Sequence, residues 1–499
     1  MPMSAQLLGL GDALRMDVVL FVLAGVLLGY VVGVLPGLNR PAALAMAVPL
    51  TYYMSPLSAV AFLVGIAKAS GAGGATTAIL INTPGEPNAA ATALDGYPLA
   101  KSGKAEKALK VALYASVAGD VLGTLVLIVV AEPLARLALR IGPVELAALT
   151  FLALTFIAAL SGRSLARGLA AAFFGILVAM IGIDAETATP RLTFGLIELA
   201  DGVPIMVVTV GMLALTEMLI QAQEYLTQGP DKSVEQPAAT QTDRTLSWPE
   251  IKSLTPTTLV SSGVGIVAGI VPGLGPTVAS FLSYALAKRW AKPHERFGEG
   301  EIKGVAAAET ADNAVVPASL IPLFALGLPG SVSAAIIIAA FTIHGVMPGP
   351  RMFEEHGRLM YGVYGAMIVA SFIMLIVGRI GLTAFAKLTL VPATVIIPFV
   401  TAACVLGAYV ETKSIFSVWL MVLFGVLGWV MHRYDYSRIT FLIGFVVGPL
   451  FELAVRQSLI ITHSNPVRLL QHPMALLLLA CAAVVLALFS FAPRTGEAK

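Results

Sequence analysis

Charged residues and cysteines are scarce in this chain of 499 residues. Charged residues make up only 12% of the sequence and hydrophobic residues 58%, whereas soluble domains carry about 25% charged residues. This composition excludes a soluble enzyme. It indicates that most of the chain faces lipid or packs against segments that do.

Several other classes of protein are excluded by what is missing. The two cysteines, Cys404 and Cys481, lie in apolar runs, which excludes a disulfide scaffold and a cysteine-built metal site. A balance of 31 basic against 29 acidic residues gives a net charge of +2, too little for a nucleic-acid binder that relies on bulk charge. The sequence has no ATP-hydrolysing phosphate loop, zinc-protease motif or serine-hydrolase motif. We therefore expect no catalytic residues, no cofactor and no nucleic-acid partner, and an ion gradient or a partner protein as the energy source.

Long apolar runs are what the chain has instead. A membrane-spanning helix needs about 20 mostly apolar residues, and about a dozen runs meet this requirement. These runs are 16–36, 57–81, 108–131, 143–160, 164–183, 202–222, 255–272, 305–327, 358–380, 389–410, 412–431, 436–455 and 473–492. The pattern predicts an all-α polytopic membrane protein with the first helix retained rather than cleaved as a signal peptide.

Four apolar stretches are too short to span a bilayer, and we interpret them as re-entrant or half helices. They are 40–53, 85–97, 275–287 and 331–345. Two lysine- and arginine-rich loops, 101–110 and 288–303, favour the cytoplasm. Each is also explained as a simple solvated loop, so the sequence leaves the membrane orientation open.

The order of motifs repeats along the chain. The first half contains GVLPGLN at 33–39 and TPG at 83–85, and the second contains GIVPGLG at 269–275 and LPG at 328–330. Each Pro-Gly pair interrupts an apolar run, and the later pair in each half is followed by small residues. We interpret this order as a duplication, so that each repeat carries broken helices.

A single long polar stretch lies near the middle of the chain. It is rich in proline, glutamine, threonine and mixed charge, which is typical of a linker. The predicted organisation is a first membrane repeat over 1–225, a linker over 226–254 and a second membrane repeat over 255–499.

Paired interruptions of this kind indicate a transporter binding site. In hydrocarbon an unpaired backbone N–H or C=O costs several kcal/mol, so a Pro-Gly break survives only where protein, water, an ion or a substrate satisfies the freed groups. A helix that begins after a break directs partial positive charge into the gap, which suits an anion. Carbonyl oxygens freed on the other side suit a sodium ion.

The polar and small residues beside the breaks are the candidate substrate ligands. Hydroxyl and amide groups there can donate to carboxylates or offer oxygens to sodium, although close helix packing also selects small residues. The candidates are Asn39, Thr76, Thr77, Asn82, Thr83, Gly85, Ser319, Gly330 and Ser331. Asn82, Thr83 and Gly330 are also candidate ligands for a sodium ion. For the glycines between 71 and 74, close helix packing is an equal explanation.

Ionisable residues before the second break are candidates for ion coupling. Glu309 and Asp312 are three positions apart, on one helical face, and Asn313 follows. Intramembrane carboxylates are costly and point to function, although a position at the aqueous end of the helix explains them equally well. For Lys68 we favour snorkelling to the interface over a buried ion pair, and for Arg40 we expect an interface anchor.

At these residues the chain resembles the large membrane subunit of tripartite tricarboxylate transporters, the TctA family. The resemblance rests on 71–108, from GAGGATTAILINTPGEPNAAA onward, and on 297–350, and in length and order it covers essentially the whole chain. Family members usually read Pro-Glu-x-x-Asn-Asn where this chain has Ala308 before Glu309 and Asp312 before Asn313. Because of this departure, the resemblance does not fix citrate as the substrate.

The resemblance implies a secondary transporter that imports tricarboxylate or dicarboxylate anions across a bacterial inner membrane, driven by a sodium or proton gradient. It implies two partners: a small TctB-like membrane subunit and a periplasmic TctC-like solute-binding protein. Paired re-entrant segments suit an elevator-type motion but do not exclude rocking. A stand-alone carrier that needs no receptor, and a channel or scaffold subunit, are the alternative functions.

Overall fold

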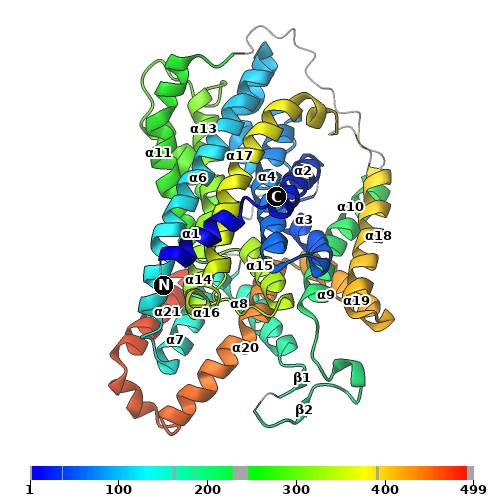
Figure 1. The fold of residues 1–499 in the computed structure, drawn as a ribbon, viewed down its shortest axis with the longest axis vertical. Coiled ribbons are helices and arrows are strands. Elements are labelled where there is room, and N and C mark those ends of the chain that lie inside the picture. The colour runs from blue at the N-terminus through cyan, green and yellow to red at the C-terminus, as the bar shows by residue number, and fades with distance from the viewer. Residues whose placement is uncertain are drawn as a thin grey trace.

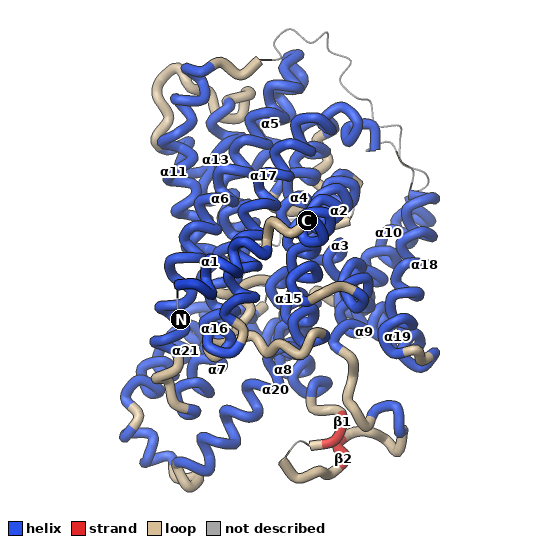
Figure 2. Tube along the Cα trace, viewed as in Figure 1, coloured by secondary structure: helices blue, strands red, loops and turns tan. Residues whose placement is uncertain are grey.

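The computed structural model describes residues 3–35, 38–160, 164–184, 186–228, 245–388, 391 and 393–491. Apart from loops, these residues are helical, with one short antiparallel hairpin in which Gly182 pairs with Arg191. Figures 1 and 2 show the bundle, with the hairpin projecting at one end. The all-α prediction is confirmed.

The helices and strands of the first half begin with a short helix and end before the polar stretch. They are α1 (Met3–Asp12), α2 (Met16–Val34), α3 (Arg40–Ala47), η1 (Val48–Tyr53), α4 (Pro56–Ile81), α5 (Ala89–Leu99), η2 (Ala100–Lys104), α6 (Ala105–Ala138), α7 (Pro143–Leu160), α8 (Leu165–Ala179), β1 (Gly182–Ile183), β2 (Pro190–Arg191), η3 (Ile197–Leu199), α9 (Ile205–Thr209), η4 (Val210–Leu215) and α10 (Thr216–Gln228).

The second half is helical throughout its described residues, apart from its loops. Its helices are α11 (Trp248–Ile270), α12 (Gly275–Arg289), α13 (Ile302–Ala318), α14 (Leu320–Leu326), α15 (Val332–Ile343), α16 (Met352–Glu355), α17 (Gly357–Leu388), α18 (Ala393–Thr412), α19 (Ile415–Arg433), α20 (Arg438–Ile461), η5 (Pro466–Gln471) and α21 (Pro473–Phe491).

Nine of the described helices are long and apolar enough to cross a membrane. The shorter apolar helices α8, α18 and α21 coincide with three further predicted spans. One predicted span, 305–327, is wrong as a continuous helix because α13 ends at Ala318 and α14 begins again at Leu320. The four stretches predicted to be half helices overlap the short helices α3, α5, α12 and α15, of which α5 and α12 each continue two residues further.

Residues that tolerate unusual backbone angles end the helices at the predicted breaks. Asn82 closes α4 in the left-handed region at φ 53°, and Gly327 closes α14 at φ 73°. Gly273 follows α11 with φ +94°. The first Pro-Gly pair, Pro36 and Gly37, lies outside the described residues.

Helix neighbours recur in the two halves. α2 packs along α4 as α11 packs along α13, and α6 packs on α13 as α17 packs on α4. Likewise, α8 packs on α20 as η4 packs on α19. In this arrangement each half covers the broken helix of the other, which is compatible with the predicted duplication. The predicted division at 226–254 stays a prediction, since 229–244 lies outside the described residues.

The two broken helices, α4 and α13, form the centre of the bundle. Every residue of α13 from Gly304 to Ala318 is buried, and α4 is buried over nearly its whole length. Both are rich in alanine, glycine, serine and threonine, which let neighbouring backbones approach closely. Polar groups on these two helices therefore lie in the interior rather than at the lipid surface.

Candidate functional site

The first interruption places an arginine in the protein interior. Arg40 is the first residue of α3 and is 3% exposed. Its Nη2 donates to Asp312 Oδ2 of α13 at 2.9 Å and lies 3.7 Å from Glu86 Oε2. A Cβ on Gly71 of α4 would collide with the guanidinium, so this glycine provides the space for it. The prediction that Arg40 anchors the membrane interface is wrong, because two buried carboxylates compensate its charge.

Glu86 belongs to the loop between α4 and α5 and connects that break to the first one. It is 5% exposed, and its Oε1 accepts hydrogen bonds from the backbone N–H of Arg40 and from the hydroxyl of Ser70. The carboxylate thus caps the N-terminus of α3, where a negative charge is favoured. The two interruptions of the first half are therefore joined by an acidic cap.

In each half, a glycine lets the second interruption pack closely against the helix end that precedes the first interruption. A Cβ on Gly85 would lie 3.0 Å from the carbonyl oxygen of Gly33, and a Cβ on Gly330 would lie 2.7 Å from that of Gly269. Gly33 and Gly269 occupy matching places in GVLPGL and GIVPGL. Because both contacts involve backbone, the close approach requires glycine at 330 and leaves little room for a side chain at 85.

The middle of α13 carries the second group of buried polar side chains. Glu309 accepts hydrogen bonds from the hydroxyls of Thr92 on α5 and Ser116 on α6. Asn313 donates from Nδ2 to the backbone oxygen of Glu309 at 3.0 Å. Asp312 Oδ1 and Asn313 Oδ1 have no hydrogen-bond partner among the described residues, although both side chains are at least 98% buried. Two buried oxygens without a protein partner are unfavourable unless water, a cation or a proton satisfies them.

The charges of this cluster do not balance. We define the acidic cluster as Arg40, Glu86, Glu309 and Asp312. Three buried carboxylates face one guanidinium, so the cluster has two excess negative charges when all four groups are ionised. Buried charge without compensation is costly. The arrangement therefore favours uptake of protons or small cations, and the equal alternative that Glu309 and Asp312 lie at an aqueous helix end is wrong.

A separate buried ion pair lies between α4, α6 and α17. Lys68 and Asp120 are both fully buried, and Lys68 Nζ lies 2.7 Å from Asp120 Oδ2. The ammonium also donates to the backbone oxygen of Met367, the hydroxyl of Ser371 and that of Thr124. The preference for a snorkelling Lys68 is wrong because its charge is compensated inside the bundle.

The predicted ligands of the first half fall into two groups. Asn82 and Thr83 are exposed: Asn82 closes α4, and the Thr83 hydroxyl donates to the backbone of Ile81. Thr76 and Thr77 are buried and donate to carbonyl oxygens of their own helix. Asn39 caps α3 by accepting from the N–H of Ala42 at 2.9 Å.

The predicted ligands of the second half lie together. The Ser331 hydroxyl donates to that of Ser319 at 3.0 Å and caps α15 by accepting from the N–H of Ala334. The N–H of Gly330 donates to the backbone oxygen of Ser319 at 3.3 Å. The structure thus brings Ser319, Gly330 and Ser331 together, and it links Asp312 to the first half through Arg40.

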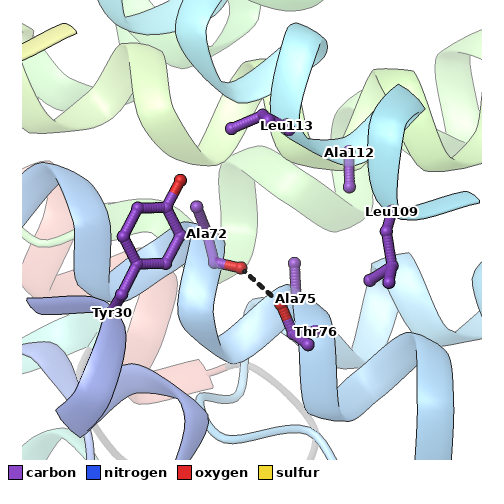
Figure 3. Close-up of a pocket in the computed structure, with 7 residues that line it drawn as sticks. All are labelled: Tyr30, Ala72, Ala75, Thr76, Leu109, Ala112 and Leu113. Carbon is purple, nitrogen blue, oxygen red and sulfur yellow. Dashed lines mark hydrogen bonds between the residues drawn. The ribbon is translucent and has the colours of Figure 1, made fainter. Parts of the chain in front are cut away.

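A small cavity lies near Thr76, between α2, α4 and α6. Figure 3 shows the side chains that line it. Tyr30 comes from α2, Ala72 and Thr76 come from α4, and Leu109 and Leu113 come from α6. The volume of about 10 Å³ is the space of about one water molecule. In this conformation the cavity does not hold a carboxylate substrate of several carbons.

Metal chemistry through clustered protein ligands is not indicated. Among the described residues, there is no group of three or more histidine, cysteine, aspartate or glutamate side chains that could hold a metal ion. The carboxylates of the acidic cluster therefore do not form a common cage. A sodium ion would use one carboxylate together with amide and backbone oxygens, and the unpaired oxygens of Asp312 and of Asn313 are each of a ligand type that such an ion accepts.

The broken central helices and the buried charges define a polytopic membrane protein of the kind used for solute transport. Residues 19–443 match the Tripartite tricarboxylate transporter TctA family. The chain belongs to this family, whose membership makes it a permease component of the tricarboxylate-transporter type.

Two relatives from Agrobacterium vitis are similar to the chain. It is 34% identical to an "Uncharacterized 52.8 kDa protein in TAR-I ttuC' 3'region" over 96% of this chain and 95% of the relative. It is 33% identical to an "Uncharacterized protein in TAR-II ttuC' 3'region" over 45% of this chain and 93% of that relative. No solved structure matches the chain.

The sequence did not predict which side chains partner the buried charges. Arg40, Glu86 and Lys68 were visible next to breaks or inside apolar runs, but their partners were not assigned. Asp120 is a single carboxylate within the predicted span 108–131, which is the signal that could have identified a buried counter-ion for Lys68. Ser116 gave no such signal, because a lone serine is ordinary in a membrane helix.

Proposed function

We propose that the chain is the permease subunit of a binding-protein-dependent secondary transporter that imports carboxylate anions across a bacterial inner membrane. It works with a small TctB-like membrane subunit and a periplasmic TctC-like solute-binding protein. Family membership supports this assignment. The substrates are dicarboxylates or tricarboxylates, and transport is symport with sodium ions or protons.

The observation that carries the proposal is the position of Arg40. A buried guanidinium stands at the N-terminus of α3, beside the first interruption, and is held by Asp312 from the other half. Guanidinium groups bind carboxylates with fixed geometry. When substrate arrives, one of its carboxylates replaces Asp312 or Glu86 at Arg40.

This exchange couples the anion to a cation. With all four groups ionised, the acidic cluster has two excess negative charges, and a substrate carboxylate adds more to a site of low dielectric. Asp312, once released from Arg40, then takes up sodium or a proton with the free oxygen of Asn313. Substrate and cation therefore bind together, which is the requirement for symport.

The moving part is the pair of broken helices. α4 and α13 contribute the site and are buried against the surrounding helices. In an elevator-type motion they move together with α5 and α15, because Glu86 and the Ser319–Ser331 contact attach these helices to the site.

Uptake by proteoliposomes tests the proposal. The chain is reconstituted with its small membrane subunit, and uptake of labelled dicarboxylates and tricarboxylates is measured with and without the solute-binding protein, under a sodium or a proton gradient. We expect saturable, receptor-dependent uptake that D312N abolishes and that S331A weakens. T342A, on an exposed hydroxyl that donates within its own helix, is the matched control.

Two results would contradict the proposal. Equal uptake without the solute-binding protein would show a stand-alone carrier. Unchanged cation dependence in D312N and in N313A would remove the coupling role from α13.

A further inference from the structure

The connection between α8 and α9 presents apolar side chains that no described part of the chain covers. We define the apolar loop as residues 192–201. Phe194 is 80% exposed and Ile197 is 84% exposed, and Leu192 and Leu196 are also exposed. Neighbouring large apolar side chains exposed together mark an interaction surface.

The backbone of the apolar loop is strained. Leu192 and Phe194 adopt φ values of 51° and 49°, which side-chain-bearing residues rarely do. Such conformations cost of order 1–3 kcal/mol each and persist at functional sites. Phe194 combines this rare backbone conformation with an 80% exposed side chain.

Ion pairs hold the β1–β2 hairpin, from which the apolar loop continues, against α20. Arg456 of α20 donates to Asp184 at 2.6 Å, and Arg191, at the end of β2, lies 3.2 Å from the same carboxylate. Glu452 of α20 bonds to Arg191 as well. The Arg456 hydrogen bond, with help from backbone N–H groups, lowers the pKa of Asp184 below its ordinary value. The β1–β2 hairpin is therefore held to α20 at neutral pH, while the apolar loop projects from the hairpin.

The loop lies on the side of the membrane away from the basic loops. Both basic loops meet at one end of the molecule, because Asp95 of α5 accepts from the N–H groups of Gly298 and Gly300. In Figure 2, α5 lies at the top and the β1–β2 hairpin at the bottom. With both lysine- and arginine-rich loops at the same end, the preference of such loops for the cytoplasm favours a periplasmic position for the apolar loop.

The connection is not required by the fold. In the second half, α19 and α20, the counterparts of α8 and η4, are joined by residues 434–437 only, whereas residues 180–204 join α8 to α9. One repeat therefore carries a long insertion on one side of the membrane. Its irregular backbone must lie outside the hydrocarbon region.

We propose that the apolar loop is the docking surface for the soluble solute-binding subunit, which would present an apolar patch bordered by basic side chains. This inference rests on the proposed function. The exposed loop carries Glu198 and Asp201 and no basic residue. Segments that lie on anionic lipid are basic, so this acidic loop favours a protein partner over the membrane surface.

Binding of the purified solute-binding protein to the assembled membrane complex in nanodiscs tests the inference. F194S/I197S weakens binding at least tenfold, which is about 1.4 kcal/mol. E198K/D201K slows association and reduces its dependence on salt. L226S is the matched control, because Leu226 is equally exposed at the end of α10. Unchanged unfolding temperatures show that the variants are folded.

The outcomes separate the two proposals. If the wild-type complex neither binds the solute-binding protein nor needs it for uptake, the proposed function and the docking surface both fail. If wild type and F194S/I197S bind it equally, only the docking surface fails. Quenching of F194W fluorescence by brominated lipid would overturn it in favour of the membrane, and loss of a dimer in F194S/I197S in favour of a second copy of the chain.

Discussion

Replacing Arg40 by glutamine tests the electrostatics of the acidic cluster. R40Q leaves Glu86, Glu309 and Asp312 without a basic partner. At an effective dielectric constant of about 20, opposite charges about 4 Å apart attract by about 4 kcal/mol. Arg40 has two such neighbours, at 2.9 and 3.7 Å, and desolvation offsets part of that attraction. We expect R40Q to lower the free energy of unfolding by about 3–5 kcal/mol.

A second substitution separates charge from packing. D312N alone removes one excess negative charge and leaves Arg40 with Glu86, so its cost should be smaller than that of R40Q. In the R40Q background, D312N should recover at least about 1.5 kcal/mol, because it removes an unpaired buried charge. Unfolding is followed by titrating detergent-solubilised protein with a denaturing detergent.

The control is an arginine at the surface. Arg358 pairs with Asp12 at 2.6 Å, but its side chain is 60% exposed, so R358Q should cost at most about 1 kcal/mol. If R40Q lowers the free energy of unfolding no more than R358Q does, the acidic cluster is not organised by charge. The same conclusion follows if the losses from R40Q and D312N simply add in the double variant, with no recovery.

Three further predictions follow from other parts of the interior. K68M should destabilise the protein by about 3–5 kcal/mol, and K68M/D120L should recover most of this loss because the buried pair is replaced by apolar side chains; unfolding titrations compare the two. G330A should reduce uptake strongly, because its Cβ would meet the carbonyl oxygens of Gly269, at the end of α11, and of Ser319, whereas G263A, with open space around it, should leave uptake unchanged. The lowered pKa of Asp184 means that its contribution to hairpin stability is present above the ordinary carboxyl pKa and is lost as pH falls through the lowered value. Hydrogen exchange of the β1–β2 hairpin should therefore accelerate only in strong acid, and D184N should show fast exchange already at neutral pH.

Local patterns made much of the helix content predictable. The apolar runs located most spans, and Pro-Gly pairs located the interruptions, because proline and glycine act on the backbone of their own neighbourhood. The 305–327 run failed for a local reason as well. It contains Pro317 and Pro322 around Ser319, and hydropathy alone does not register the helix end between α13 and α14.

The partners of the buried charges were not predictable. Arg40 and Asp312 are separated by 272 positions and Lys68 and Ser371 by 303. A lone charge in an apolar run is compatible with snorkelling and with burial, and only the packing of other helices over it distinguishes the two. Asn82 lies beside a break and closes α4 at the surface, and its predicted role as a ligand stays a prediction.

By itself, the sequence determined that this is a helical membrane protein with interrupted segments, and it predicted their repetition in two halves. These properties follow from hydropathy and from backbone restrictions, which act over a few residues. The tertiary structure decided which charges are buried, which carboxylates share Arg40, and which loop projects from the bundle. Those outcomes depend on contacts between helices far apart in the chain, because the cost of a buried charge is set by its neighbours in space.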